Sequence, residues 1–160
     1  MLGLFKKEND AKTFLTKEEN QILLKRVEKF ENQTGCELAF HIRQNLGSDP
    51  LKANEALFFK FGLDKTEHRN AILVTVALAE RQFAIWADVG VMRQSGDKLW
   101  NDISQKMEGA LKLGQHLAAF TLVADMSENV LSKEQSAVSR MPNGNELSNK
   151  PIIESDEEPQ

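Results

Sequence analysis

Residues 70–90 read Asn-Ala-Ile-Leu-Val-Thr-Val-Ala-Leu-Ala-Glu-Arg-Gln-Phe-Ala-Ile-Trp-Ala-Asp-Val-Gly, and this stretch decides the fold. Its first part, residues 71–78, is almost wholly apolar and has the length of a strand buried on both faces. After a break at residues 79–80, residues 81–88 alternate between two faces, as a half-buried strand does. The two runs predict a β-hairpin, although Ala-Glu is not among the favoured turn sequences.

The composition is that of a globular domain. The chain has 160 residues, a length that favours one domain, and 41% of them are hydrophobic, which supports a packed core. The formal net charge is −4, and no dense basic stretch is present. Because no stretch is basic enough to bind along a phosphate backbone, we expect no nucleic acid among the partners of this protein.

The compartment is predicted from cysteine usage and from the N-terminal residues. Cys36 is the single cysteine, so an intrachain disulfide is excluded, and a lone thiol suits a reducing compartment. The first seven residues, Met-Leu-Gly-Leu-Phe-Lys-Lys, lack the apolar core and cleavage site of a signal peptide. No run reaches the ~18 apolar residues of a membrane span. We therefore expect a soluble, cytoplasmic and monomeric protein without a membrane span.

The other elements are predicted from cap residues and apolar spacing. A capping box at Thr16–Glu19 begins a helix that ends near Gly35, and an alternating strand follows over residues 36–43. Asp49-Pro50 begins a second helix, which Gly62 ends. Two further helices are expected from residues 95–97 onward and after Gly114. The inner faces of the second and third helices are predicted to carry Ala53, Leu57 and Phe61, and Leu99 or Trp100, Ile103, Met107 and Ala110, respectively.

This order of elements predicts the topology. A strand–helix–strand unit implies a right-handed parallel crossover for the first two strands, and the hairpin adds an antiparallel third strand. A continuously apolar central strand needs cover on both faces, so helices should lie on both sides of the sheet. The predicted fold class is α/β, a three-layer α/β/α sandwich with a small mixed β-sheet.

The domain is expected to occupy residues 16–132, between two segments of different composition. Residues 1–15 are interpreted as a polar N-terminal arm with a few apolar docking points. From residue 133 to residue 160 the apolar period stops, and this tail holds three of the four prolines and nine charged residues with a net charge of −3. Such an acidic segment buries too little apolar surface to offset its ordering entropy and is predicted to be disordered.

Several blocks in order resemble a known family. Residues 34–38 (Thr-Gly-Cys-Glu-Leu), 61–74, 80–85 and 88–90 (Asp-Val-Gly) are similar to the TPM domain, and the resemblance covers roughly residues 16–132. This family includes thylakoid-lumen proteins reported as acid phosphatases, an auxiliary subunit of an animal receptor, and short soluble bacterial members. The resemblance implies an α/β/α sandwich. Many relatives carry Gly-x-Gly in place of residues 88–90, and many have a signal peptide and a membrane helix, neither of which is recognised here.

Charged side chains gather at one predicted edge of the sheet. The starts of the two parallel strands and the end of the third should converge there, close to the start of the third helix. This places one cation, Arg69, with four candidate metal-ligating carboxylates: Glu37, Glu67, Asp88 and Asp97. Oxygen-rich sites suit Ca²⁺ or Mg²⁺, and Arg69 beside such an ion could hold a phosphate ester. The simpler interpretation is a surface ion pair between Arg69 and Asp88 that closes the edge of the sheet.

Two functions remain open from the sequence. One is an accessory or binding module that modulates a partner protein and takes a divalent cation at the charged edge. The other is a low-specificity, metal-assisted phosphatase. Cys36 is interpreted as a core thiol and His41 as a half-buried histidine, and no nucleophile–base motif is recognised. The absence of such a motif favours the accessory module.

Overall fold

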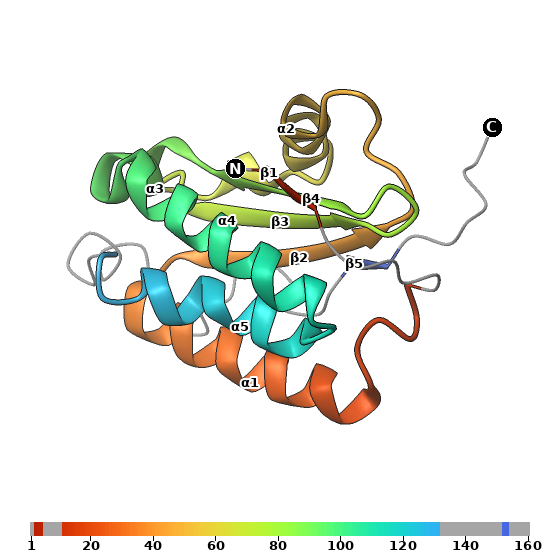
Figure 1. Ribbon diagram of the computed structural model, residues 1–160. Helices are drawn as coiled ribbons and strands as arrows, with labels where there is room; N and C mark the ends of the chain where they lie inside the picture. The colour runs from red at the N-terminus through yellow and green to blue at the C-terminus, as the bar shows by residue number, and fades with distance from the viewer. Residues whose placement is uncertain (1, 5–10, 132–151, 154–160) are drawn as a thin grey trace.

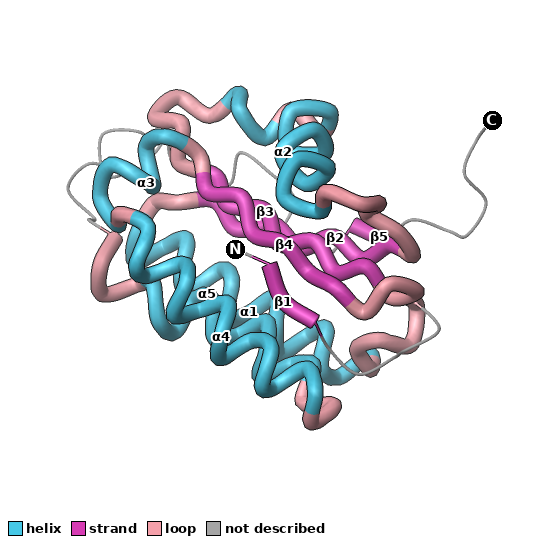
Figure 2. Tube along the Cα trace, turned by 45° about the horizontal axis from the view of Figure 1, so that its top comes forward, coloured by secondary structure: helices cyan, strands magenta, loops and turns pink. Residues whose placement is uncertain are grey.

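The fold is organised around a mixed five-stranded sheet with the strand order β1-β4-β3-β2-β5 (Figures 1 and 2). The computed structural model describes residues 2–4, 11–131 and 152–153. β2 pairs with β3 and with β5 in parallel, whereas β4 pairs with β3 and with β1 in antiparallel fashion. The strands are β1 (Leu2–Leu4), β2 (Glu37–Arg43), β3 (Ala71–Ala77), β4 (Gln82–Ala87) and β5 (Ile152–Ile153).

The central strand is β3, and it forms the predicted hairpin with β4. All seven residues of β3 are buried, as expected for a strand covered on both faces. β3 ends at Ala77, which pairs with Gln82 at the start of β4. The turn between them is closed by a hydrogen bond from the Arg81 N–H to the Leu78 carbonyl, with Arg81 at a φ of 52°. The connection is therefore four residues long and centred on the expected Ala-Glu pair.

Helices cover both faces of the sheet, which confirms the predicted α/β fold and its three layers (Figure 1). One face carries α2 (Pro50–Lys60), which is followed by the short 3-10 helix η1 (Leu63–Lys65). The other face carries α1 (Lys17–Thr34), α4 (Asp97–Lys112) and α5 (His116–Ser127). The ladder from Glu37 paired with Ala71 to Arg43 paired with Ala77 confirms the parallel crossover.

The sheet divides the core into two apolar clusters. The larger cluster lies between the sheet and the three-helix layer, and its largest fully buried side chains are Phe14, Phe30, Phe40, Phe83, Trp100 and Phe120. Trp100 is the inward residue of α4, while Leu99 is only partly buried against the cluster. The smaller cluster lies under α2, where Phe58 and Leu73 are fully buried. The larger share of the buried apolar surface, and with it of the hydrophobic stabilisation, therefore lies on the three-helix side of the sheet.

The inner face of α2 was predicted only in part: Leu57 is buried as expected, but the most deeply buried residues are others. Asn54 and Phe58 are fully buried on its inner face, whereas Ala53 and Phe61 are only partly buried. The Asn54 side-chain amide donates to the Leu73 and Ala84 carbonyls at 3.2 Å each. Its Oδ1 accepts the Thr75 hydroxyl at 2.6 Å. A count of apolar residues misses this arrangement because the buried stripe contains a polar residue that is satisfied by the sheet.

The helix boundaries follow the predicted caps. Thr16 and Glu19 form the expected capping box at the start of α1, with both reciprocal bonds at 3.0 Å. Gly35 ends this helix at a φ of 72°, a left-handed conformation that glycine adopts without strain. Asp49 caps α2, and Pro50 occupies its first turn. Local sequence therefore determines where these two helices begin and end.

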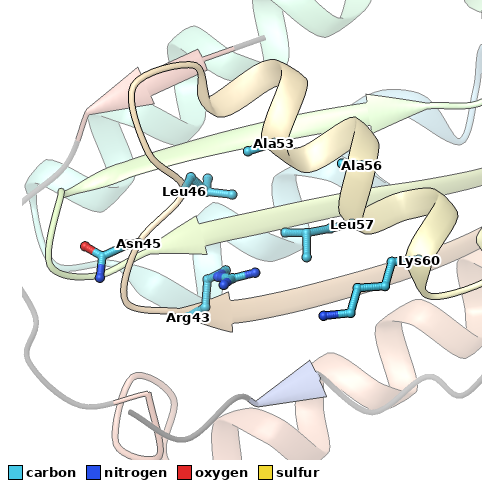
Figure 3. A pocket seen from close by; sticks show the side chains of 7 residues that line it. All are labelled: Arg43, Asn45, Leu46, Ala53, Ala56, Leu57 and Lys60. Atoms are coloured by element: carbon cyan, nitrogen blue, oxygen red, sulfur yellow. The ribbon is translucent and has the colours of Figure 1, made fainter. Parts of the chain in front are cut away.

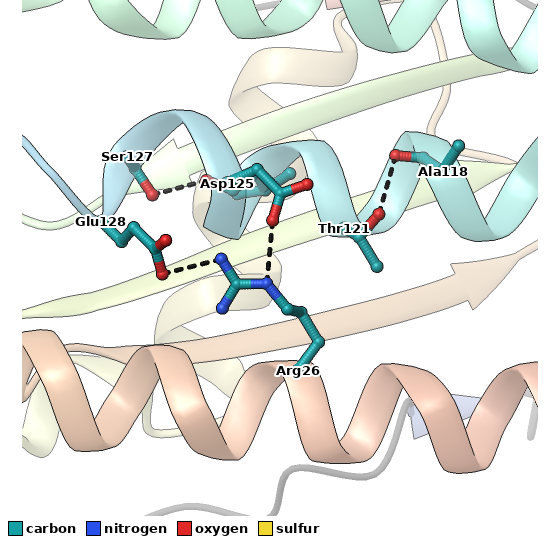
Figure 4. Close-up of polar contacts among 7 residues, drawn as sticks. Arg26, Ala118, Thr121, Asp125, Ser127 and Glu128 are labelled. Carbon is teal, nitrogen blue, oxygen red and sulfur yellow. Dashed lines mark hydrogen bonds and ion pairs between the residues drawn. The ribbon is translucent and has the colours of Figure 1, made fainter.

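An ion pair links α1 to α5 on the outer side of the three-helix layer (Figure 4). Arg26 Nε donates to Asp125 at 2.8 Å, and Arg26 Nη2 donates to Glu128 at 2.7 Å. Burial lowers the pKa of Arg26, but hydrogen bonds to the two carboxylates outweigh it, and the pKa is raised. This partly exposed cluster holds the helices together without contributing to the charged edge of the sheet.

Besides the short 3-10 helix η1, two strands and one helix were not predicted. β1 and β5 are three and two residues long, which is too short to show a period. The helix α3 (Val89–Ser95) follows β4 through the single residue Asp88.

The expected polar arm contributes Ala11, Phe14 and Leu15 to the core. Most of the tail lies outside the described residues, so its predicted disorder stays a prediction. In the described part of the chain, no helix is both long and apolar enough to cross a membrane.

Candidate functional site

The predicted edge of the sheet forms where β2 and β3 begin and β4 ends. Glu37 is paired with Ala71 across the parallel ladder, and the Glu37 N–H donates to the Asn70 carbonyl at 3.1 Å. On the other side of β3, the Asp88 N–H donates to the Ala71 carbonyl at 3.0 Å. Laterally paired residues share a face, so Glu37 and Asp88 lie on the α2 face of the sheet, about 10 Å apart in backbone spacing.

A two-pronged ion pair between Arg69 and Asp88 lies at this edge. Arg69 Nε donates to Oδ2 of Asp88 at 2.6 Å, and Arg69 Nη2 donates to Oδ1 at 2.8 Å. The Asp88 side chain is 1% exposed, whereas the Arg69 side chain is 41% exposed. Hydrogen bonding to Asp88, followed by the attraction of its charge, raises the pKa of Arg69. This paired geometry matches the simpler interpretation, with a carboxylate that is buried rather than on the surface.

Asp88 also starts α3. Its Oδ1 accepts the Val89 N–H at 2.8 Å, and its extended backbone ends the sheet ladder before the helix begins. Asp88 therefore closes the sheet with its backbone N–H, while its carboxylate caps a helix and holds the guanidinium of Arg69. Both of its oxygens are occupied by these partners.

The loop before β3 is shaped to present Arg69. Arg69 has a φ of 51°, the left-handed region that side-chain-bearing residues rarely adopt. The next residue, Asn70, donates its backbone N–H to Thr66 Oγ1 at 3.1 Å and its side-chain amide to the Gly35 carbonyl at 2.9 Å. The Gly90 N–H donates to the Arg69 carbonyl at 2.8 Å. These bonds tie the loop to α1 and α3 and fix the position of the cation.

The remaining candidate ligands are dispersed. Glu37 is 3% exposed, whereas Glu67 and Asp97 are exposed, the latter at the start of α4. Within residues 11–131 and the short flanking strands, no three His, Cys, Asp or Glu side chains are grouped as metal ligands. Since Arg69 occupies both oxygens of Asp88, the side chains as arranged do not form a Ca²⁺ or Mg²⁺ site, and a cation would have to replace Arg69.

Four side chains that could act as nucleophiles or bases, those of Cys36, His41, Thr75 and His116, are buried. Cys36 is fully buried, as expected of a core thiol. The His116 ring stacks on Phe14 with 4.0 Å between ring centroids, and its Nδ1 lies 2.8 Å from the Phe14 carbonyl oxygen. The Thr75 hydroxyl lies 3.5 Å from His41 Nδ1, but both side chains are 0% exposed beneath α2. No substrate reaches this threonine–histidine pair.

His41 should make the protein sensitive to acid. Burial, together with the nearby charges of Arg43 and Lys60, lowers the pKa of His41 from 6.5 to about 3. Between these values the unfolded chain binds a proton that the folded chain does not, so stability falls as the pH drops below 6.5. His41 alone should lower the free energy of unfolding by about 2 kcal/mol between pH 7 and pH 5.

Urea unfolding of the parent and of His41→Gln at both pH values measures this contribution. The acid-induced loss of stability should be smaller in His41→Gln by about the same 2 kcal/mol. Equal losses in the two proteins would show that His41 is not a buried neutral histidine. Carboxylates that titrate in both proteins cancel in the comparison.

A second feature lies at the opposite end of β2. A pocket of about 250 Å³ opens between this strand end and α2. It contains two cationic residues, Arg43 and Lys60, and the polar residue Asn45. Nothing in the sequence signals this pocket, because Arg43 and Lys60 are read as exposed residues at the ends of a strand and a helix.

The fold and the charged edge together define a small α/β/α domain of the kind expected from the sequence blocks. The TPM domain family matches residues 9–130, and the chain belongs to this family. No match is found among curated proteins.

Solved structures with the same fold include three bacterial proteins. The BA42 protein of the psychrophilic bacterium Bizionia argentinensis has 20% identity and a TM-score of 0.77, covering 91% of this chain and 99% of that one. The N-terminal domain of cg2496 from Corynebacterium glutamicum has 13% identity and a TM-score of 0.61, covering 77% and 78%. An N-terminal domain from P. gingivalis has 18% identity and a TM-score of 0.58, covering 77% and 84%. At these identities the similarity establishes the fold.

Proposed function

We propose that this TPM domain is an accessory binding module that modulates a partner protein. The observation that carries this proposal is the construction of the charged edge. The Arg69–Asp88 pair is held by a strained backbone, a helix cap and loop hydrogen bonds, and the Arg69 side chain remains 41% exposed. A half-exposed guanidinium in a fixed position suits recognition of an acidic group. The burial of Thr75 and His41 supports binding over catalysis.

The proposal also includes a divalent cation bound at the same edge. Glu37 and Asp88 flank Ala71 on one face of the sheet, and Glu67 and Asp97 are expected to supply further oxygens. A Ca²⁺ or Mg²⁺ ion would take the place of the Arg69 guanidinium on the Asp88 carboxylate. Released Arg69 would then extend into solvent beside the ion. The cation and Arg69 therefore compete for the same two oxygens.

The second candidate function is a low-specificity, metal-assisted phosphatase. It is favoured by the same pair, since a released Arg69 beside a cation could hold a phosphate ester while water attacks the phosphorus. This function requires the cation, whereas the accessory module does not. Hydrolysis of p-nitrophenyl phosphate with Mg²⁺ or Ca²⁺ distinguishes them, because the accessory module should give no turnover above buffer. Turnover lost in Arg69→Ala would replace the accessory module with the phosphatase.

Competition between Arg69 and the cation predicts opposite effects of two substitutions. In calorimetric titrations with Ca²⁺ and Mg²⁺, Asp88→Asn should weaken binding because it removes a charged oxygen ligand. Arg69→Ala should leave the affinity unchanged or raise it, because it removes the competing cation. Arg69→Ala should also weaken binding of an acidic partner group.

A distant ion pair supplies the control. Asp125→Asn and Arg26→Ala disturb the pair between α1 and α5 and should leave cation affinity as in the parent (Figure 4). The absence of both heat and a shift in melting temperature at millimolar ion in the parent would rule out the cation. A purely structural pair would show small and similar stability changes in both edge variants and no ligand in either.

A further inference from the structure

The outer edge of β2 carries a strand of only two residues, β5. It pairs in parallel with the carboxyl half of β2, with Ile152 opposite His41 and Ile153 opposite Ile42. In Figure 3, which looks into the pocket under α2, β5 is the pale blue arrow that runs beside β2 in the same direction. Among the strands that the structure describes, β5 alone pairs with this side of β2. It covers only part of the edge, since β2 is seven residues long.

The amino half of the same edge is closed by a side chain. The Glu37 N–H donates toward β3, to the Asn70 carbonyl, so the N–H of the next residue points to the outer side. There the Leu38 N–H donates to Oε2 of Glu31, a buried residue of α1, at 3.0 Å. A carboxylate in this position stops an added strand from extending past Leu38. Strand addition is thereby confined to residues 40–42.

The middle of β2 lacks the usual protection of an edge strand. Natural edges are protected by charged side chains, by proline or by a bulge. Residues 38–42 read Leu-Ala-Phe-His-Ile, and the ladder with β3 is continuous from Glu37 to Arg43. Burial, with the charges of two nearby cations, lowers the pKa of His41 to about 3, so this side chain is uncharged at neutral pH. The edge therefore favours pairing with another extended backbone.

β5 is a weak occupant of this edge. Ile152 is partly buried, while Ile153 is 45% exposed. Two paired residues make few backbone hydrogen bonds, each of which adds only modestly to stability. Residues 128–151 join β5 to α5, and such a covalent connection raises the local concentration of a strand to the order of millimolar. A separate segment with a dissociation constant below that range can therefore replace β5.

We propose that the edge of β2 at residues 40–42 binds an extended segment of a partner protein by parallel strand addition, and that β5 occupies this site in the absence of the partner. The partner segment carries two consecutive branched aliphatic residues, as β5 does. The first lies on the α2 face beside His41, and the second lies on the three-helix face beside Ile42. Main-chain bonds supply the affinity in this mode of recognition, and alternate side chains supply the specificity. The site does not depend on the accessory function proposed for the charged edge.

A peptide with the sequence of residues 149–156, Asn-Lys-Pro-Ile-Ile-Glu-Ser-Asp, serves as the partner segment. The receptor is the full chain with Ile152→Pro and Ile153→Pro, which removes both N–H donors of β5. Titration should shift the backbone amides of residues 39–43 in a saturable manner. In the parent, β5 leaves the edge open for only a fraction of the time, so the peptide should bind at least about threefold more weakly. Equal affinities, or the absence of saturable shifts in the variant, would overturn the proposal.

Two controls concern the receptor. Circular dichroism should show that the proline variant is folded and melts within a few degrees of the parent, because β5 adds little to the core. An unfolded variant would show that β5 is part of the fold and not an exchangeable occupant, and would overturn the proposal. Glu157→Pro and Glu158→Pro place two prolines beyond β5, so this second variant should bind the peptide as the parent does.

Three matched peptides test the recognition. The reversed sequence keeps the composition and charge but should bind at least about tenfold more weakly, because its direction and the order of its side chains are wrong. Ile152→Ser in the peptide should lower the affinity about tenfold, and Ile153→Ser should lower it less, since Ile152 is the more buried of the two. Equal binding of the reversed peptide, or a larger loss from Ile153→Ser, would contradict the proposed register.

The direction of the bound peptide and the role of a second copy are measured separately. A nitroxide at the amino end of the peptide should broaden the amides of residues 37–39 most, and one at the carboxyl end should broaden those of residues 43–45. The opposite pattern would overturn parallel addition. In sedimentation experiments the parent should stay monomeric. A parent dimer that is lost in the proline variant would assign the edge to β5 of a second copy and would overturn the proposal of a separate partner.

Discussion

Val74→Asp is expected to unfold most of the protein. Val74 is 0% exposed at the middle of β3, where it pairs with Phe40 on one side and Ile85 on the other. Its side chain belongs to the larger cluster, between the sheet and the three-helix layer. An aspartate there would bury a carboxylate without a partner, or force the strand out of the sheet. The cost is several kcal/mol, against a typical total stability of ~5–15 kcal/mol.

Circular dichroism during thermal and urea unfolding measures this effect. Val74→Asp should show a large loss of native signal, or a strongly lowered midpoint. Ile22→Asp is the control, because Ile22 is 53% exposed on α1 and its change should cost within about 0.5 kcal/mol. If Val74→Asp melted within a few degrees of the parent, β3 would not be the doubly covered centre of the fold.

The parts of the fold that were predicted correctly depend on local chemistry. The apolar run of residues 71–78 requires a strand with two covered faces whatever its neighbours are. Thr16, Glu19, Asp49 and Pro50 set helix starts through bonds made within one turn. The parallel crossover then follows from the order of the elements, without knowledge of any contact.

The parts that were missed depend on contacts between distant residues. Asn54 faces inward because Thr75 and the carbonyls of β3 and β4 satisfy its amide, and these partners are 19 to 30 residues away. β1 and β5 exist only because β4 and β2 offer open edges to short segments. α3 was missed because the Asp88-Val89-Gly90 sequence was interpreted as the end of a strand and not also as a helix start.

The position of the charged edge was predictable from the sequence, but the bonding geometry of its side chains was not. Strand order alone brings Arg69 and Asp88 to one edge, since Arg69 comes just before β3, Asp88 comes just after β4, and the two strands are antiparallel. The two-pronged bond depends on the positive φ of Arg69 and on the turn of α3, which no residue pattern indicates. The pocket with Arg43 and Lys60 required the placement of α2 over the sheet, and neither residue stands out in the sequence.

Gly90→Ala is expected to have the second large effect, because it acts on the contact that shapes the charged edge. A Cβ at Gly90 would lie 2.0 Å from the His68 carbonyl oxygen and 2.7 Å from that of Arg69, so the backbone must move. The movement would break the hydrogen bond from the Gly90 N–H to the Arg69 carbonyl and displace the guanidinium from Asp88. Overpacking of this kind costs about 1–3 kcal/mol or more.

A second glycine in a helix gives a control of opposite sign. Gly109 lies within α4 with open space around its would-be Cβ, so Gly109→Ala should stabilise the protein by about 0.5–1 kcal/mol. Urea unfolding should therefore move the two midpoints in opposite directions. In Gly90→Ala, the amide signals of residues 66–70 and 88–91 should shift most, with the three-helix layer unchanged. A stabilised Gly90→Ala would mean that α3 does not pack against the Arg69 loop, and that the charged edge is not held in a fixed form.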